Sequence, residues 1–313
     1  MQVRLRAVAA LAGLATAACA ARAPVPDPTA APVETRAYTQ GPLRITLRIP
    51  ASPPGPKPVA LSPFLDADTL LASGFVVAEY QFEWAEVARL KGLPPPEPEA
   101  PATQPTDGER VGAWLLSSPR PGIVGRAYFQ LVAASASINV PAVVDLLVRQ
   151  PEVDPTRIAI FGSSTFGFVA LEALRDDPRL ALGIVRVACG DYETFLRAST
   201  LALADDPRWL VNGRAPLDAD YEAEVHEHQP IDHADAYPPR PLLLLAGRTD
   251  RVMPYECVER TEEALGAAYA RAGVADRFRV EAFSEEGHQL GAESDAIALD
   301  WLVRWLQGPD TPR

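Results

Sequence analysis

Lysine, histidine and cysteine are scarce in this 313-residue chain. Lys57 and Lys91 are the only lysines among the 29 basic residues, and the chain has four histidines and three cysteines. Acidic residues number 41, so the formal net charge is −12. The phosphate backbone of a nucleic acid repels a surface of that sign, and a nucleic-acid partner is therefore not expected.

Apolar residues, by contrast, are plentiful. They make up 48% of the chain, against 22% charged residues. A chain of this length and apolar content can bury a sizeable core, so disorder throughout is excluded even with 32 prolines to place. The length fits one large α/β domain or two small ones.

The amino terminus is typical of a targeting signal. Arg4 and Arg6 precede an apolar run over residues 7–18, which is too short to span a membrane and is followed by Cys19. We therefore expect a secretory signal peptide over residues 1–18. The last six residues of this region, LATAAC, resemble a bacterial lipobox, in which Cys19 would be acylated and become the first mature residue. Thr16 departs from that pattern, so ordinary signal cleavage is the alternative.

Export would have two further consequences. Residues 19–36, rich in Ala and Pro, are expected to form a solvated tether. The protein would then be a bacterial envelope lipoprotein anchored to the membrane through Cys19, or a periplasmic or secreted protein. In an oxidising compartment Cys189 and Cys257 could form a disulfide, although two small buried apolar side chains explain these residues equally well.

Strand and helix patterns alternate through the rest of the chain. Apolar or alternating runs predict strands at residues 44–49, 59–61, 74–82, 157–161, 182–189, 241–246 and 278–283. Helical periodicity is found at residues 127–149, 167–175, 257–271 and 296–306. This alternation indicates an α/β fold with a mostly parallel sheet covered on both faces. Within one domain at residues 37–308, we expect an exposed loop at 91–107 and a lid at 191–239, with a tail at 309–313.

The fourth predicted strand runs through a tight turn into a helix. Gly162 and Ser164 in that turn resemble the nucleophile elbow Gly-x-Ser-x-Gly of the α/β-hydrolase superfamily. The second glycine position holds Phe166, and Gly167 follows one residue late. The resemblance names Ser164 as the nucleophile, whereas a frame shifted by one residue would name Thr165 and leave Gly162 unused. An ordinary strand–helix turn with polar caps is the third interpretation.

Two later strand ends complete the pattern. An apolar strand is followed by Gly247, Asp250 and Pro254, which resembles the acid turn of the same superfamily. The last strand is followed, after a glycine, by His288, which resembles the loop of the catalytic histidine. The resemblance therefore implies a triad of Ser164, Asp250 and His288. In such a triad the imidazole takes the serine proton, and the carboxylate orients the imidazole and stabilises its cation.

The implied oxyanion hole needs two N–H donors. Thr165, directly after the nucleophile, supplies one of them. The second usually comes from a loop after an earlier strand, and here residues 61–64 are Leu-Ser-Pro-Phe. Because Pro63 has no N–H, the N–H of Phe64 is the candidate.

The remaining histidines lie together in the expected lid. His226, His228 and His233 could suggest a metal site. His-x-His on polar sequence without cysteine is more typical of a solvated surface. We expect no metal and no other cofactor.

Within the superfamily, the chain resembles the dienelactone-hydrolase-like and prolyl-oligopeptidase-like branch. Residues 153–158, VDPTRI, and 230–234, PIDHA, carry that likeness. It implies an exported serine hydrolase that cleaves a small-molecule ester, or another acyl substrate, through an acyl-enzyme. Few residues precede the first predicted strand, so a propeller domain is not expected and an esterase is favoured over a peptidase.

Three alternatives are left by the sequence. A serine peptidase or an acyltransferase could use the same triad, because the leaving group and the acceptor depend on pocket shape. The departures at Phe166 and Pro63 would also fit a non-catalytic, hydrolase-like binding protein of the cell envelope. Substrate-binding residues and the oligomeric state cannot be assigned from the sequence.

Overall fold

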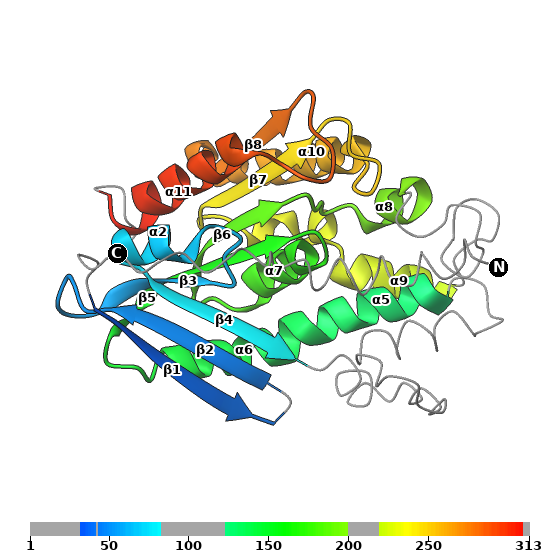
Figure 1. The fold of residues 1–313 in the computed structure, drawn as a ribbon. Helices are drawn as coiled ribbons and strands as arrows, with labels where there is room; N and C mark the ends of the chain where they lie inside the picture. Colours follow the sequence, from blue (N-terminus) through cyan, green and yellow to red (C-terminus); the bar gives the residue numbers. More distant parts are fainter. Residues whose placement is uncertain (1–31, 42, 83–122, 200–218, 309–313) are drawn as a thin grey trace, which may run out of the picture.

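The computed structural model describes residues 32–41, 43–82, 123–199 and 219–308. Within them the chain forms an eight-stranded sheet in the order β1-β2-β4-β3-β5-β6-β7-β8 (Figure 1). The β1–β2 and β2–β4 pairs are antiparallel, and the other five pairs are parallel. The strands are β1 Val33–Gln40, β2 Leu43–Pro50, β3 Lys57–Leu61, β4 Val76–Phe82, β5 Val153–Ser163, β6 Leu180–Arg186, β7 Leu242–Gly247 and β8 Phe278–Phe283.

Helices cover both faces of this sheet (Figure 1). The first face packs against α5 Ile123–Ala134, η1 Ser135–Asn139, α6 Val140–Leu147, α7 Thr165–Asp176, α8 Tyr192–Ala198, α9 Ala219–His228, η2 Pro230–Ala236 and α10 Tyr255–Arg271. The second face packs against α2 Ala67–Ala72 and α11 Ala292–Leu306. A short 3₁₀ helix, η3 Ala275–Arg277, leads into β8.

The position of each strand explains its sequence. β3 and β7 have a neighbouring strand on each side and are buried along their whole length, and apart from Lys57 at the start of β3 their side chains are apolar. β2 lies beside the exposed edge strand β1 and alternates, with Leu43, Ile45 and Leu47 buried and Arg44 exposed between the first two. The buried apolar side chains form a first core on the first face of the sheet and a second core on the second face.

One helical stretch among the described residues, Phe129–Leu147, is long and apolar enough to cross a membrane by length and composition alone. It runs through α5, η1 and α6, and 61% of its apolar window is buried inside the protein. That burial, against the first face of the sheet, is what a core helix of this composition requires.

The predicted mostly parallel α/β sheet is confirmed, and each predicted strand overlaps an observed one. Outside the expected lid, three observed elements were not predicted, namely β1, α2 and η3. β1 begins at Val33, so residues 33–36 belong to the sheet and not to the tether expected there. Its sequence, VETRAYTQ, lacks apolar alternation because the strand lies exposed at the sheet edge.

Several predictions concern residues outside the described ranges. They are the signal peptide with Cys19, the first part of the tether, the loop at 91–107, the middle of the expected lid at 200–218 and the tail at 309–313. The described ends of that lid are α8, α9 and η2. Of these, η2 packs against α7 and α10, and Tyr237 just beyond it is fully buried with its hydroxyl donating to the Leu171 carbonyl at 3.2 Å.

Candidate active site

Ser164 lies in the turn between β5 and α7, at the carboxyl end of the sheet. Its backbone has φ 55° and ψ −120°, a region that residues with a Cβ rarely adopt. Such strain persists only where the surroundings enforce it. Here the Ser164 N–H donates to the Arg186 carbonyl at the end of β6 (2.9 Å), and the Ser164 carbonyl accepts from Gly167 (2.8 Å).

Two glycines make this turn possible. A Cβ on Gly162 would lie 2.1 Å from the Phe166 carbonyl oxygen, and a Cβ on Gly167 would lie 2.4 Å from the Cβ of Ala188. Gly162 therefore lets the strand approach the turn, and Gly167 lets α7 approach β6. The glycine that arrives one residue late in the sequence thus has a packing role of its own.

Phe166, at the position where the superfamily has glycine, points its ring into the protein. The side chain is half-buried against the first core, with its ring 6.3 Å from that of Tyr80 in an edge-to-face arrangement. The tight contact at this residue is made by its carbonyl oxygen, which faces Gly162. The turn therefore accepts a large side chain here because the ring and the crowded backbone point in different directions.

Asp250 lies in the turn after β7. Its side chain is 1% exposed, and Oδ1 accepts from the N–H groups of Val252 (2.8 Å) and Met253 (2.9 Å). The turn packs tightly on the loop after β8, since a Cβ on Gly247 would lie 2.3 Å from the Gly287 carbonyl oxygen. The acid turn and the histidine loop are thus placed against each other by backbone contact.

His288 joins the two ends of the site. Its Nδ1 lies 2.8 Å from Oδ2 of Asp250, and its Nε2 lies 3.0 Å from Oγ of Ser164. Asp250 can only accept, so Nδ1 donates to it and Nε2 is left to accept from the serine hydroxyl. The structure thus brings Ser164, Asp250 and His288 together in hydrogen-bonding order.

Two other carboxylates that lie between Ser164 and His288 in the sequence, Asp232 and Glu256, bond elsewhere. Asp232 pairs with His226, with Oδ2 2.6 Å from Nδ1, and Glu256 lies 3.7 Å from Arg260. The shifted frame, with Thr165 as nucleophile, has no support from His288, which is bonded to Ser164.

The predicted oxyanion donors, Thr165 and Phe64, flank the elbow. Thr165 is the first residue of α7, and Phe64 lies in the loop that follows β3. That loop begins with Ser62 at φ 53°, and the Phe64 ring packs edge-on against Phe161 of β5 at 5.4 Å. The loop after β3 is therefore held next to the strand that carries the nucleophile.

Arg186, which sequence reasoning missed, lies beside Phe64 and Ser163. Its guanidinium carbon is 4.0 Å from the centre of the Phe64 ring, and its Nε donates to Ser163 Oγ at 3.4 Å. A charged residue inside the apolar run LALGIVRVACG was the available signal.

The three other histidines bond to different partners. His228 Nδ1 lies 3.1 Å from the buried Glu172, which also accepts from the Tyr192 hydroxyl at 2.8 Å. The bond to Glu172 raises the pKa of His228. His233 Nε2 donates to the Glu227 carbonyl at 2.9 Å, and His226 pairs with Asp232 as described. Among the residues that the structure describes, no group of three or more His, Cys, Asp and Glu side chains is arranged to hold a metal ion.

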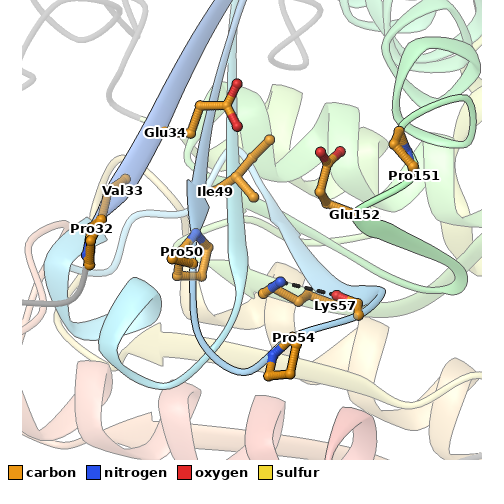
Figure 2. Close-up of a pocket in the computed structure, with 11 residues that line it drawn as sticks. Pro32, Val33, Glu34, Ile49, Pro50, Pro54, Lys57, Pro151 and Glu152 are labelled. Carbon is orange, nitrogen blue, oxygen red and sulfur yellow. Dashed lines mark hydrogen bonds between the residues drawn. The ribbon is translucent and has the colours of Figure 1, made fainter.

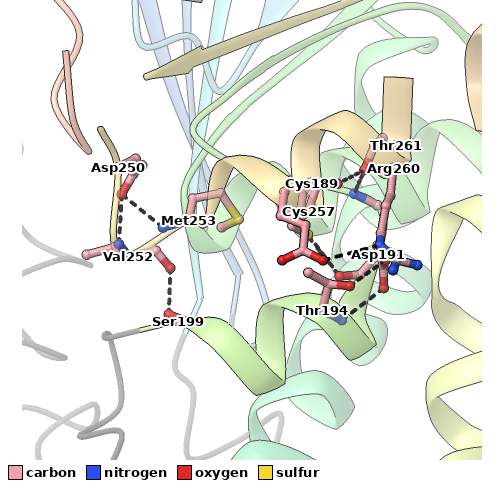
Figure 3. Close-up of a disulfide and its surroundings, with 12 residues drawn as sticks. Cys189, Asp191, Thr194, Ser199, Asp250, Val252, Met253, Cys257, Arg260 and Thr261 are labelled. Carbon is pink, nitrogen blue, oxygen red and sulfur yellow. Dashed lines mark hydrogen bonds and ion pairs between the residues drawn. A yellow bond between two sulfur atoms is a disulfide. The ribbon is translucent and has the colours of Figure 1, made fainter. Parts of the chain in front are cut away.

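Cys189 and Cys257 form a disulfide, so the first of the two interpretations of these residues is the observed one (Figure 3). It links the segment after β6 to the start of α10, and both cysteines are fully buried. Beside it, Ser199 donates to the Val252 carbonyl of the acid turn at 2.5 Å. Along the chain, Cys257 follows Asp250 by seven residues.

A separate pocket of about 500 Å³ lies at the opposite, amino-terminal end of the parallel strands (Figure 2). It is lined mainly by prolines and apolar side chains, with the buried Lys57 donating to the Gly55 carbonyl at 3.0 Å. No member of the triad lines it. Parallel sheets bind substrates at their carboxyl edge, so the triad and not this pocket marks the candidate active site.

Comparison with known proteins agrees with this placement. The model of the prolyl oligopeptidase family matches residues 139–309, which is just over half of the chain and includes all three triad positions. The chain belongs to the prolyl oligopeptidase family. The resemblance predicted from the motifs is confirmed at this level.

Relatives in and around the prolyl oligopeptidase family extend the comparison. The Bacillus subtilis (strain 168) protein named "Putative hydrolase YtaP" is 28% identical over 164 residues, which is 52% of this chain and 50% of that protein. The Pyrococcus horikoshii acylaminoacyl peptidase superposes with a TM-score of 0.60 at 15% identity, over 91% of this chain and 44% of that one. This chain thus spans about half the length of these relatives.

The glucuronoyl esterase from Solibacter usitatus is matched over more of its length. It superposes with a TM-score of 0.57 at 16% identity, over 90% of this chain and 87% of that one. At such identities the likeness concerns the fold, and the predicted α/β-hydrolase fold is confirmed by it.

Proposed function

We propose that this member of the prolyl oligopeptidase family is a serine hydrolase that cleaves carboxylic esters through an acyl-enzyme. The observation that carries the proposal is the continuous hydrogen-bond chain from Ser164 through His288 to Asp250. A serine hydroxyl is a weak nucleophile until a neighbouring base accepts its proton. Here His288 would be that base, and Asp250 would be the carboxylate that orients it.

The proposal gives each group a role. Ser164 Oγ attacks the substrate carbonyl while His288 Nε2 takes its proton, and Asp250 stabilises the imidazolium that forms. The N–H groups of Thr165 and Phe64 would stabilise the oxyanion. His288 then returns the proton to the leaving alcohol, and water, activated by the same imidazole, releases the acid from Ser164.

Amide hydrolysis is the second candidate. It uses the same steps but depends more on proton delivery, because an amine leaves only after His288 has protonated it. The family name and the acylaminoacyl peptidase favour it, whereas the fold likeness to glucuronoyl esterase favours an ester. An acyltransferase would differ only in replacing water by another acceptor.

A fluorophosphonate probe combined with a substrate panel tests the proposal. We expect the probe to label Ser164 and the protein to hydrolyse short aryl esters faster than the matching acyl anilides. Ser164→Ala should abolish labelling and lower kcat by a factor of about 10⁴ to 10⁶, because triad members act as a unit. Ser137→Ala, an exposed serine on η1, is the matched control and should label normally.

Two other outcomes of this experiment would contradict the esterase proposal. Protein that neither labels nor cleaves any ester or amide is a non-catalytic binding protein. Anilides cleaved faster than esters would make it a peptidase.

We also propose that the protein is exported and that Cys19 carries the lipid anchor. The basic and apolar start of the sequence supports export, and a buried disulfide suits an oxidising compartment. Stable anchoring takes at least two acyl chains, so mass spectrometry of native protein should find a multiply acylated Cys19 at the amino terminus. An unmodified amino terminus downstream of Cys19, in a soluble fraction, contradicts the anchor but not the export.

A further inference from the structure

Arg186 ends β6, directly beside the strand that carries the nucleophile. In the parallel register Arg186 is the partner of Ser163, and its carbonyl accepts the Ser164 N–H at 2.9 Å. Its side chain lies on the second face of the sheet, next to Phe64 and α11. The residue therefore contacts the elbow through its backbone and has its side chain free to contact something else.

The guanidinium makes three contacts to three different segments. It stacks on the Phe64 ring at 4.0 Å, its Nε donates to Ser163 Oγ at 3.4 Å, and its Nη1 lies 3.1 Å from Oδ1 of Asp295 in the first turn of α11. The side chain is 20% exposed, so the stacking is partly shielded from water. A cation over an aromatic face is attracted more strongly where water is excluded.

The Phe64 ring is thereby enclosed between two groups. Phe161 packs against it edge-on, and Arg186 covers it. Two residues precede Phe64 in this loop. The Ser62 N–H donates to the Ala78 carbonyl at 2.7 Å, and Pro63 has no N–H to donate. After Phe64, Leu65 is buried in the core and Asp66 caps α2. Phe64 itself is thus held between these neighbours by the contacts that its ring makes.

We propose that Arg186 is a positioning residue for the oxyanion hole: by stacking on Phe64 and bonding to Ser163, it fixes the Phe64 N–H relative to the nucleophile. The inference rests on the proposed serine-hydrolase function and adds a residue that the triad does not contain. Asp295 in turn fixes the guanidinium. Arg186 acts through Phe64 and need not touch the substrate.

The proposal predicts a specific kinetic change. Oxyanion donors act in the transition state, so a misplaced donor lowers kcat and leaves KM nearly unchanged. For Arg186→Met, which keeps an unbranched apolar stem, we expect kcat to fall about 10- to 100-fold, less than for complete loss of a donor. Arg186→Lys keeps a charge near the ring but not the forked geometry, and should recover part of the loss. KM should change by less than about twofold for both variants.

The matched control is Arg179, immediately before the other end of β6. Its guanidinium pairs with Asp177 at 2.7 Å and Asp145 at 2.5 Å. These ion pairs lie at the end of β6 that is far from the elbow. Arg179→Met removes the same groups from the same segment, and kcat should stay within about twofold of wild type. Melting temperatures of all variants separate loss of folded protein from loss of turnover.

A double-mutant cycle with Phe64→Leu provides the decisive test. If Arg186 acts through the Phe64 ring, the effects of the two substitutions on kcat will not multiply, and Arg186→Met will lower kcat little once the ring is gone. Independent effects that multiply, or a rise in KM with kcat unchanged, would overturn the positioning role and assign Arg186 to structure or to substrate binding.

Wild-type protein that neither labels at Ser164 nor hydrolyses any substrate overturns this inference together with the proposed function. Active wild type with multiplying effects overturns this inference alone.

Discussion

On the nucleophile side of the candidate active site, close packing holds a strained backbone, whereas on the acid side hydrogen bonds within the turn hold ordinary backbone close to a disulfide. Ser164 has φ 55°, and neither Gly162 nor Gly167 has room for a Cβ. Asp250 instead accepts from two backbone N–H groups of its own turn. The Cys189–Cys257 bond lies a few residues away.

This difference indicates how each side responds to change. Packing constraints cannot relax gradually, because a side chain either fits or displaces its neighbours. Hydrogen-bonded turns keep their geometry when a remote support is removed, since each bond is local. We therefore expect changes on the acid side to separate activity from stability, and changes on the nucleophile side to affect stability first.

Among the changes that test this comparison, Asp250→Asn should have the largest effect, and it should lower activity without lowering stability. The Asn oxygen can still accept from Val252 and Met253, so the turn is retained. Its amide N–H₂ then faces His288 Nδ1 and leaves the imidazole in the wrong tautomer. We expect kcat to fall by about 10⁴ with the melting temperature nearly unchanged. Asp232→Asn is the matched control; near-normal activity of Asp250→Asn would contradict the assigned acid.

Removing the disulfide should show the reverse behaviour. Cys189→Ala combined with Cys257→Ala should lower the free energy of unfolding by about 2–4 kcal/mol, measured by denaturant titration. Activity at 25 °C should stay within a few-fold of wild type, because the turn of Asp250 holds itself. Lost activity with unchanged stability would show instead that the disulfide positions the acid.

Phe166→Gly tests the nucleophile side. The ring is half-buried against the core and Tyr80, so its removal should cost about 2–3 kcal/mol of stability, including the cost of glycine at a helix start. Phe166→Leu keeps most of the apolar contact and should cost less. Paired melting and ester-hydrolysis measurements check both variants. An unchanged melting temperature together with faster turnover would mean that the ring obstructs the elbow.

The smallest expected effect depends on pH. His228, at the end of α9, bonds to Glu172 of α7, the helix that follows the nucleophile, with Arg175 and Glu227 nearby. Because the folded-state pKa of His228 is raised, its stabilisation is fully present below the ordinary value of about 6.5 and is lost as the pH rises through the raised value. The melting-temperature difference between wild type and His228→Gln should therefore shrink between pH 6 and pH 9. A difference that is constant or grows over this range would contradict the role of the pair.

Hydrophobic periodicity and the order of the motifs were sufficient to predict much of the fold and the three triad positions. Buried strands such as β7 are recognisable because two covered faces require an unbroken apolar run. Ser164, Asp250 and His288 follow strand ends, and the topology brings strand ends to one edge. The structure adds the hydrogen-bond distances that relate them.

What the sequence could not supply depends on contacts between distant segments. β1 is polar and exposed, so its pairing with β2 leaves no apolar pattern. The partner of each cysteine, and the stacking of Arg186 on Phe64, are set by how β6 lies against α10 and the loop after β3. Phe166 departs from the elbow pattern, and the direction of its ring, which explains why the turn accepts it, cannot be deduced from its position in the motif.

The Cys189–Cys257 bond closes a covalent ring of chain that includes α9, β7 and Asp250. A protease that cuts once anywhere between the two cysteines would leave both fragments joined, with the acid still attached to the segment after β6. Nicked protein would therefore migrate as one species on a non-reducing gel and as two after reduction. In an environment that contains proteases, this arrangement would let the molecule survive a single cut in the segment that carries the proposed catalytic acid.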